Sequence, residues 1–328
     1  MLISVNKKQI KNHVFYLGLM ITLALIGFHP SSFSQNPVDV NYEKDNDGNI
    51  KFYCNNDDFC SYIIEVRFEQ MVNLRSNAFI PYKTDVRPGR TDLFELKPVN
   101  PNVFSTFSYS FITIKGCVNP RIKSDFIYLL PVGEEKVTEA FGIEYIRIND
   151  KDPEPKDFYA IGFTMDPDDT VYAARKGTVV SLRDTTKLKL SGYVYSSEDN
   201  YIEIVHDDCS FGRYDILSKT FVNSGQKVNA GDPIGLAGGE KYSSGTQVRF
   251  SVHYNYEQRT TIKNTDGSNI VMYWAFVPLF FYTKESNATR LIIGHKYTSI
   301  HPENIITQEM SKMQISRWKK HKIAPSKK

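Results

Sequence analysis

Side chains able to bind a metal ion gather at one place in the chain, the run His206-Asp207-Asp208-Cys209. Imidazole, carboxylate and thiolate groups are the ligands that zinc takes from proteins. The other histidines are scattered along the sequence, at His13, His29, His253, His295, His301 and His321. No Cys-x-x-Cys pair or other Cys/His spacing typical of a structural zinc site accompanies them. A metal site built from the four consecutive residues is therefore only a weak alternative.

The residues around this run predict short strands joined by tight turns. Residues 201–205 (YIEIV) are typical of a strand that ends just before His206, and residues 248–252 (VRFSV) alternate as a strand does. Residues 222–239 are punctuated by glycine, which supplies the positive φ that tight turns need. Because no long amphipathic helix pattern is evident, the sequence predicts an all-β protein.

Three stretches in the second half of the chain share the same character, in that each contains a short apolar strand pattern beside a turn. They are residues 159–165 (YAIGFTM) with 171–180 (VYAARKGTVV), residues 204–208 (IVHDD) with 212–217 (GRYDIL), and residues 225–238 (GQKVNAGDPIGLAG) with 247–252 (QVRFSV).

Taken in this order, the three stretches resemble the lysostaphin/LytM family of zinc endopeptidases, which cut peptide bonds in peptidoglycan. The family patterns are Y-A-x-D-F-x-M with V-x-A-A-x-x-G-x-V, a strand ending in His with Y-x-H-L, and G-x-x-V-x-x-G-x-x-I-G-x-x-G with H-x-H-F-x-V. The resemblance implies the duplicated-hybrid-motif β fold of the family for residues 134–302. It also implies that His206 is structural, because the family often has a His at the end of that strand that is not a ligand.

The resemblance also implies a set of functional positions, and all of them are changed in this sequence. The family binds zinc with a His, an Asp four residues later and the second His of H-x-H. The first His of that pair and the His of Y-x-H-L assist the attacking water. The residues at these places, in the same order, are Phe158, Gly162, Arg249, Gln247 and Ile216. A catalytic zinc needs three protein ligands and an open position, so we predict no zinc or other cofactor.

Arg249 is the change that opposes zinc binding most strongly, because a guanidinium stays protonated and positively charged. At about 4 Å and an effective dielectric of about 20, it would repel a zinc ion by roughly 8 kcal/mol. Gln247 lies two residues earlier and so projects from the same strand face. We expect Arg249 on the floor of the former groove, paired with an acidic side chain or a ligand carboxylate. The alternative is an Arg249 turned to solvent on a slipped strand. The predicted binding residues are Arg249, Gln247 and Tyr214.

Residues 1–34 predict a signal peptide. Lysines precede an uncharged, mostly apolar run over residues 14–28, which Pro30 ends, and Ser32 and Ser34 place small residues where a signal peptidase reads. The run is shorter than the roughly 20 residues of a membrane-spanning helix. We therefore expect export to a bacterial periplasm or cell surface, with no membrane span after cleavage. An uncleaved anchor is the alternative.

Loss of that segment removes three lysines and no acidic residue, so the formal net charge falls from +3 to zero. Without a global basic field, nucleic acid is not an expected partner. Basic residues remain concentrated in residues 303–328, which we interpret as a solvated C-terminal tail. Contact of this tail with an anionic envelope surface is the alternative.

The first half of the mature chain predicts a separate domain. Over residues 35–119, short alternating segments are divided by turns such as Asp45-Asn46-Asp47-Gly48, a pattern typical of an immunoglobulin-like β-sandwich. Residues 120–133 are expected to be a linker to the second domain. Cys54 and Cys60 bracket a short polar loop, and an oxidising compartment favours a disulfide between them. The pairing of Cys117 and Cys209 stays open at this stage.

The sequence favours a non-catalytic, peptidase-like envelope protein. Its ligand is expected to be peptidoglycan or a partner protein, such as a cell-wall hydrolase or an envelope complex. An active peptidoglycan metalloendopeptidase with displaced zinc ligands is the enzymatic alternative. A scaffold domain whose groove has closed is the structural one.

Overall fold

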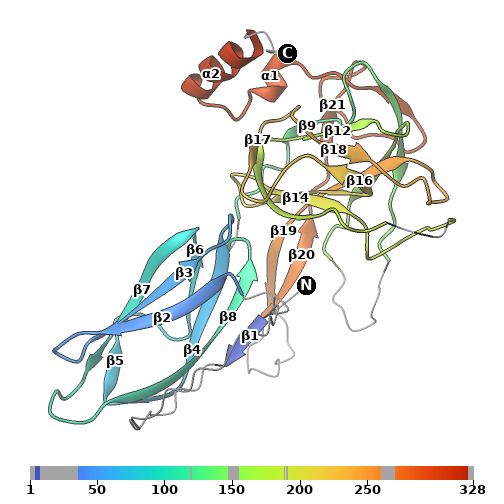
Figure 1. Cartoon of the computed structure of the whole chain (residues 1–328). Helices are drawn as coiled ribbons and strands as arrows, with labels where there is room; N and C mark the ends of the chain where they lie inside the picture. The colour runs from blue at the N-terminus through green and yellow to red at the C-terminus, as the bar shows by residue number, and fades with distance from the viewer. Residues whose placement is uncertain are drawn as a thin grey trace, which may run out of the picture. The chain divides into compact units, whose positions relative to one another are not determined.

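The computed structural model of the chain describes residues 4–7, 36–118, 120–146, 155–187, 189, 191–259 and 270–323. They divide into two compact units, Met1–Cys117 and Val118–Lys328. Regular structure in both units is almost entirely β, which confirms the predicted all-β class (Figure 1).

The N-terminal unit contains two sheets of four strands each. Its strands are β1 (Ser4–Lys7), β2 (Val38–Lys44), β3 (Ile50–Asn56), β4 (Tyr62–Val72), β5 (Leu74–Ser76), β6 (Tyr82–Val86), β7 (Gly89–Pro98) and β8 (Thr106–Lys115). The sheet orders are β1-β8-β4-β6 and β2-β3-β7-β5. Strand β1 falls within the predicted signal peptide and pairs with β8, whereas residues 1–3 and 8–34, the rest of that prediction, lie outside the described residues.

An aromatic core joins the two sheets of this unit. Phe52 and Phe94 come from one sheet and stack at 4.7 Å between ring centroids, and Tyr109 from the other sheet meets Phe52 edge-on at 5.1 Å. The residues of β3 alternate between buried and more exposed positions, as expected for a strand with one face in the core. The two sheets therefore form a sandwich.

The predicted Cys54–Cys60 disulfide is wrong, because both side chains are thiols. Cys54 is fully buried in the core of the sandwich, and burial raises its thiol pKa to about 12. The loop is instead closed by the side-chain amide of Asn56, which donates to the carbonyl oxygens of Cys60 (2.9 Å) and Val86 (3.2 Å).

The C-terminal unit is built from fourteen strands and two helices. They are β9 (Ile127–Leu129), β10 (Val137–Gly142), β11 (Ala160–Thr164), β12 (Thr170–Tyr172), β13 (Gly177–Arg183), β14 (Tyr201–Val205), β15 (Phe211–Asp215), β16 (Leu217–Thr220), β17 (Lys227–Val228), β18 (Pro233–Ala237), β19 (Gln247–Arg259), β20 (Ile270–Phe276), β21 (Phe280–Tyr282), β22 (Lys296–Thr298), α1 (Glu303–Ile306) and α2 (Lys312–Ile323).

A nine-stranded sheet and a three-stranded sheet share the core of this unit. The large sheet runs β17-β13-β14-β15-β19-β11-β10-β22, with β20 also paired to β19, and the small sheet runs β12-β18-β16. Phe163, Tyr214 and Phe250 of the large sheet belong to the same buried cluster as Val171 and Ile234 of the small one. The large sheet therefore packs one face on the core, and residues of its other face, among them Asp215 and Arg249, are half-buried.

The segment predicted as a linker, residues 120–133, is part of this unit. It contributes β9, which pairs with β21 in parallel, and Tyr128 and Leu129 are almost fully buried. Burying a run of apolar and aromatic side chains stabilises the unit, which explains why the segment is not a free connection.

The segment predicted as a solvated tail contains two helices, α1 (Glu303–Ile306) and α2 (Lys312–Ile323). Ile305 and Ile306 are buried in a cluster with Leu129. Ser311 caps α2, because its backbone N–H donates to the side-chain oxygen of Gln314 (2.8 Å) while the Gln314 N–H donates to Ser311 Oγ (3.3 Å). This reciprocal pair of hydrogen bonds is a capping box, which favours the start of a helix at this point. The basic composition of the segment alone suggests a free tail.

A buried arginine anchors the C-terminal segment to the core. The guanidinium of Arg175 is 1% exposed and donates to both carboxylate oxygens of Glu309, at 3.0 and 2.7 Å. Its Nη1 lies 3.0 Å from Asp208 Oδ2, and its Cζ lies 3.9 Å from the centroid of the Phe126 ring. Burial alone would lower the pKa of Arg175, but the hydrogen bonds to Glu309, together with the electrostatic effects of Tyr128, Asp208 and Glu309, outweigh it and keep that pKa raised.

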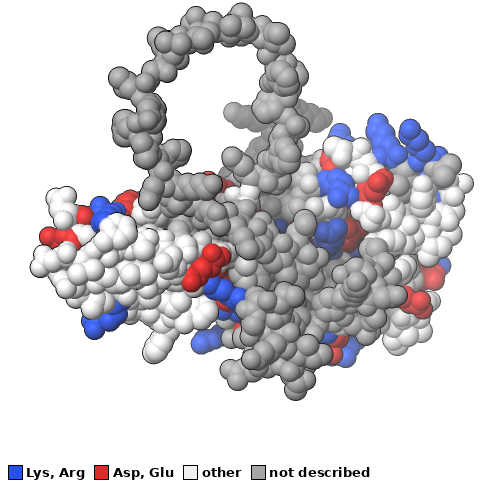
Figure 2. All heavy atoms as spheres, turned by 90° about the horizontal axis from the view of Figure 1, so that it is seen from below, with Lys and Arg blue, Asp and Glu red and all other residues white. Residues whose placement is uncertain are grey.

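The surface of the described residues mixes both charges. On the face shown in Figure 2, basic and acidic side chains are interspersed among larger uncharged areas. Within the described part of the chain, neither helix is long and apolar enough to cross a membrane.

We expect Glu309→Ala to lower the free energy of unfolding of the C-terminal unit by about 3 kcal/mol, because it leaves a buried charge short of a partner. The matched control is Glu303→Ala, whose carboxylate pairs with Lys319 at the surface and contributes about 0–1 kcal/mol. Urea unfolding followed by tryptophan fluorescence measures both losses. Equal losses in the two variants would contradict the anchoring role of Arg175.

Candidate functional site

Two of the predicted site positions, Gly162 and Arg249, are paired on the face of the large sheet that points away from the core. Phe141 of β10 pairs with Gly162 of β11, Gly162 pairs with Arg249 of β19, and Arg249 pairs with Asp215 of β15. Directly paired residues of neighbouring strands project to the same face. Phe141, Gly162, Arg249 and Asp215 therefore form one row across four strands, and we call this the site row.

Phe141 fills the space where the family places the ligand Asp. A methyl group built on Gly162 would overlap three carbons of the Phe141 ring, Cζ, Cε1 and Cε2. Any side chain at position 162 therefore requires the ring to move. Phe141 lies outside the sequence motifs, and only the pairing of β10 with β11 reveals its role.

Arg249 and Gln247 form a hydrogen-bonded pair at the other two positions on β19. Arg249 Nε donates to Gln247 Oε1 at 3.0 Å, and Gln247 is fully buried. The Gln247 amide also donates to Gly245 O at 3.0 Å. The two side chains project from the same face, as predicted from their spacing.

A loop carbonyl supplies the second partner of Arg249. Arg249 Nη2 donates to Val194 O at 3.2 Å, and the guanidinium carbon lies 4.9 Å from the ring centroid of Tyr242. The loop is fixed in turn, since Ser243 N donates to Tyr193 O at 2.9 Å. Among the described residues no carboxylate forms an ion pair with Arg249, so the acidic partner predicted for it is not part of this site as it stands.

Ile216, at the position of the Y-x-H-L histidine, has a left-handed backbone with φ of 67°. This conformation is strained for a β-branched residue. Ile216 is buried against a glycine turn, and its carbonyl accepts a hydrogen bond from Gly238 N at 2.9 Å. Only a small neighbour fits there, because a Cβ on Gly239 would lie 2.8 Å from Ile216 Cγ2.

Two further predicted positions are occupied by packed aromatic residues. Phe158 lies between Tyr145 and Phe276, with ring centroids 5.3 and 4.8 Å away. Tyr214 is fully buried, and its hydroxyl accepts a hydrogen bond from Ala174 N at 2.7 Å. Its assignment as a binding residue is therefore wrong, because its side chain points into the core and not along the site row.

Charged side chains continue the site face beyond Arg249. Arg213 Nη2 lies 2.9 Å from Asp215 Oδ1, and the Arg213 guanidinium carbon lies 3.9 Å from the ring centroid of Tyr201. Asp199 accepts a hydrogen bond from the Tyr242 hydroxyl at 2.5 Å. Burial raises the pKa of Asp199, although Tyr242 and Arg249 act against that shift. The face is therefore polar and carries both charges.

The run His206–Cys209 is not arranged as a metal site. The Nδ1–H of His206 donates to Lys176 O at 2.8 Å, and its buried Nε2 has no hydrogen-bond partner. The ring is packed so closely against Gly212 that a Cβ there would lie 2.8 Å from Nε2. Asp208 is paired with Arg175, and Cys209 is disulfide-bonded.

The electrostatics of the run also keep His206 neutral. Burial, followed by the positive charge of Arg175, lowers the pKa of His206 far below its ordinary value. Burial alone would raise the pKa of Asp208, but Arg175 and the hydrogen bonds from Ser210 outweigh it and lower that pKa. His206 is therefore a core histidine, as the resemblance implied.

The residues present do not fit a zinc ion. Phe141 covers the position of the carboxylate ligand, and a guanidinium stands where the last imidazole would be. Across the described part of the chain, no group of three or more His, Cys, Asp or Glu side chains is placed to hold a metal ion.

The fold and the site row together define a lysostaphin/LytM-type β domain in which the metal-binding positions are altered. Residues 157–261 match Peptidase family M23, and this part of the chain is a domain of that family.

Similar solved structures include peptidases and an assembly. The catalytic domain of the antimicrobial peptidase lysostaphin from Staphylococcus simulans is 26% identical, over 36% of this chain and 79% of that one, with a TM-score of 0.25. A chain of the SpoIIQ-SpoIIIAH pore forming complex is 23% identical, over 45% and 89%, with a TM-score of 0.28. A zinc containing peptidase from Vibrio cholerae is 16% identical, over 65% and 81%, with a TM-score of 0.26.

We expect Gly162→Ala to lower the free energy of unfolding by about 1–3 kcal/mol, because the new methyl group displaces the Phe141 ring. The loss should shrink in the Phe141→Ala background, which a double-mutant cycle with urea unfolding measures. Gly142→Ala is the matched control, since its nearest atoms belong to Ile293 at an ordinary 3.7 Å. Equal losses from Gly162→Ala with and without Phe141 would contradict the overlap.

We also expect His206 to make the folded protein acid-sensitive. Its pKa is lowered on folding, so below about pH 6.5 the unfolded chain binds a proton that the folded chain excludes. As the pH falls below about 6.5, the free energy of unfolding then decreases by up to about 1.4 kcal/mol for each pH unit. It is regained as the pH rises back above about 6.5. Urea unfolding between pH 7 and pH 5 should show a shallower dependence for His206→Gln. Parallel curves for the two proteins would refute this assignment.

Proposed function

We propose that this chain is a non-catalytic, exported envelope protein, and that the site face of its M23 domain binds peptidoglycan or a partner protein such as a cell-wall hydrolase. The observation that carries the proposal is the site row. Gly162, with the Phe141 ring packed against it, and Arg249 stand at the positions where a metallopeptidase of this family needs two of its zinc ligands. The substitutions replace the metal with packing and a fixed positive charge.

The chemistry of the site face supports a binding role. Within the part of the chain that the structure describes, Arg249 donates hydrogen bonds from Nε and Nη2 only, which leaves Nη1 unpaired there. Such a group forms charge-assisted, bidentate hydrogen bonds with a carboxylate. Arg213 and Asp215 continue the face with charges of both signs, which suits a peptide that carries both amino and carboxyl groups.

The enzymatic alternative, a peptidoglycan metalloendopeptidase with displaced ligands, is less favoured. Displaced ligands would have to come from nearby imidazole or carboxylate groups. Of these, His206 and Asp208 are already committed to Lys176 and Arg175, and Asp215 is paired with Arg213.

One observation favours the third reading, a scaffold whose groove has closed. The carbonyl of Val194 rests on Arg249, so the loop covers part of the site row. Val194 itself is 70% exposed, and a loop attached mainly by such contacts can open at low cost. We therefore regard the loop as a cover over a binding surface.

The test is a sedimentation assay in which the mature protein is spun down with purified peptidoglycan sacculi. We expect binding without release of soluble wall fragments, and Arg249→Ala should weaken binding by roughly tenfold, or about 1.4 kcal/mol. Lys219→Ala, an exposed lysine of β16, is the matched control and should bind like the wild type.

Two results would contradict the proposal. Release of soluble fragments by the wild-type protein would show that the chain is an enzyme. Wall binding by Arg249→Ala equal to that of the wild type would show that the site face is not the surface that binds.

A further inference from the structure

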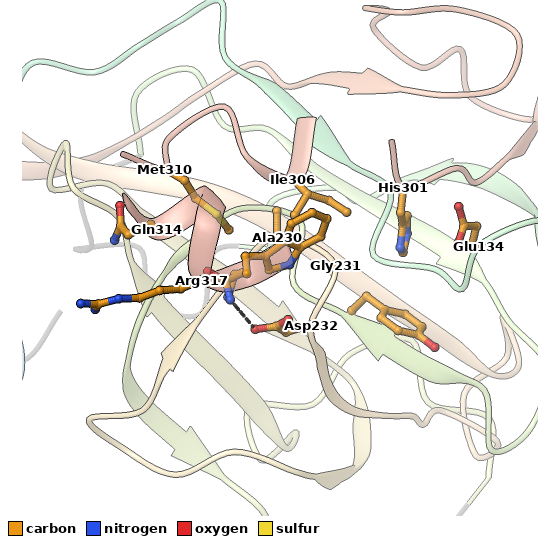
Figure 3. A pocket seen from close by; sticks show the side chains of 12 residues that line it. Glu134, Ala230, Gly231, Asp232, His301, Ile306, Met310, Gln314 and Arg317 are labelled. Atoms are coloured by element: carbon orange, nitrogen blue, oxygen red, sulfur yellow. Dashed lines mark hydrogen bonds between the residues drawn. The ribbon is translucent and has the colours of Figure 1, made fainter. Parts of the chain in front are cut away.

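A cavity of about 650 Å³ lies between the core of the C-terminal unit and the C-terminal helices, away from the site row. One wall is the turn at residues 229–232, between β17 and β18, and the opposite wall includes Ile306, Gln314 and Trp318 (Figure 3). Its size is in the range of cavities that enclose a small organic ligand. Neither the family motifs nor the proposed function uses this cavity.

The cavity is held in shape by the anchoring of the C-terminal segment. Besides the Arg175–Glu309 pair, Lys176 Nζ donates to Glu309 O at 3.0 Å and Gln308 Nε2 donates to Ile127 O at 2.8 Å. Half-buried Trp318 packs against the cluster that contains Ile306 and Leu129. A cavity with walls fixed in this way binds a ligand at little cost in conformational entropy.

The turn wall presents one oriented hydrogen-bond acceptor. Asp232 Oδ2 accepts from the backbone N–H of Asn229 at 2.7 Å and from its side-chain amide at 3.2 Å. These bonds fix the carboxylate and leave Oδ1 to accept from a ligand (Figure 3).

The helix wall presents one oriented donor. Gln314 Oε1 is occupied by the Ser311 N–H of the capping box, so the amide nitrogen of Gln314 is the end that remains to donate. Between donor and acceptor, Ala230, Ile306 and Met310 supply apolar surface beside the indole of Trp318.

We propose that this cavity binds a saccharide of one or two pyranose rings. A sugar hydroxyl both donates and accepts hydrogen bonds, which matches Gln314 and Asp232 together. The apolar C–H face of a pyranose ring packs on the flat face of an indole, which Trp318 provides.

The charges of the residues that line the cavity favour an uncharged saccharide over an ammonium or an anionic ligand. Asp232 is the one partly buried carboxylate, and two donors already compensate it. Glu134 is exposed, so solvent and salt screen its charge. Arg317 lines the mouth, and Figure 3 shows its guanidinium directed away from Asp232 and Glu134.

The experiment titrates the purified mature chain with chitobiose and cellobiose, and in parallel with spermidine as the ammonium probe. Binding is followed by saturation-transfer NMR of the ligand. We expect at least one disaccharide to bind. Trp318→Ala and Asp232→Asn should each weaken that binding about tenfold or more, whereas Lys320→Ala, on α2 but outside the cavity lining, should leave it unchanged.

Asp232→Asn keeps the shape of the turn, so it tests the site even if Trp318→Ala loosens the helix. Three results would overturn the proposal: neither disaccharide binds, spermidine binds in their place, or both cavity variants bind the disaccharide as the wild type does. Because the test uses soluble sugars and residues far in sequence from Arg249, its failure is distinguishable from failure of wall binding by the site face.

Discussion

The buried guanidinium of Arg175 is the charge around which the C-terminal unit is arranged. A cation taken out of water is tolerated only where carboxylates and hydrogen bonds surround it. Glu309 and Asp208 both form ion pairs with this guanidinium. Glu309 comes from the C-terminal segment, and Asp208 from the turn after β14. The same charge keeps His206 neutral, fixes the two helices against the core and so forms the cavity beside Trp318.

In the site row, side-chain packing occupies positions where the family binds a metal ion. In the family pattern, a His, an Asp four residues later and the second His of H-x-H bind a metal ion. Here the same backbone geometry brings together an aromatic ring, a glycine and an arginine. Phe141 fills the space beside Gly162, and Arg249 supplies a positive charge. The strained backbone of Ile216 beside Gly238 and Gly239 suggests that this turn is kept for its shape.

Much of the fold could be predicted because the signals are local. The order of the glycine-rich turns and the alternation in residues 248–252 indicate both the strands and the family. The change at the metal-ligand positions could also be predicted, since it depends only on residue identity at Phe158, Gly162 and Arg249. These predictions needed no knowledge of which strands pair.

The errors come from features that depend on tertiary contacts. Phe141 lies outside every motif, and only its pairing with Gly162 gives it a role. Tyr214 has a residue type suited to binding, but strand alternation turns it inward. Cys54 and Cys60 have a spacing suited to a disulfide, whereas the amide of Asn56 closes the loop. The C-terminal helices were not predicted, because the basic composition of residues 303–328 suggested a free tail. Ser311 and Gln314 nevertheless form a capping signal that is detectable in the sequence.

The most direct test of the central claim, that packing and charge have replaced the metal, is the zinc content of the purified mature chain. The protein would be equilibrated with excess zinc, separated from free metal and examined by elemental analysis. We expect well below one zinc ion per chain, because no ligand set of the kind zinc needs is present among the described residues. About one zinc ion per chain, retained through separation and removed by a chelator, would contradict the account.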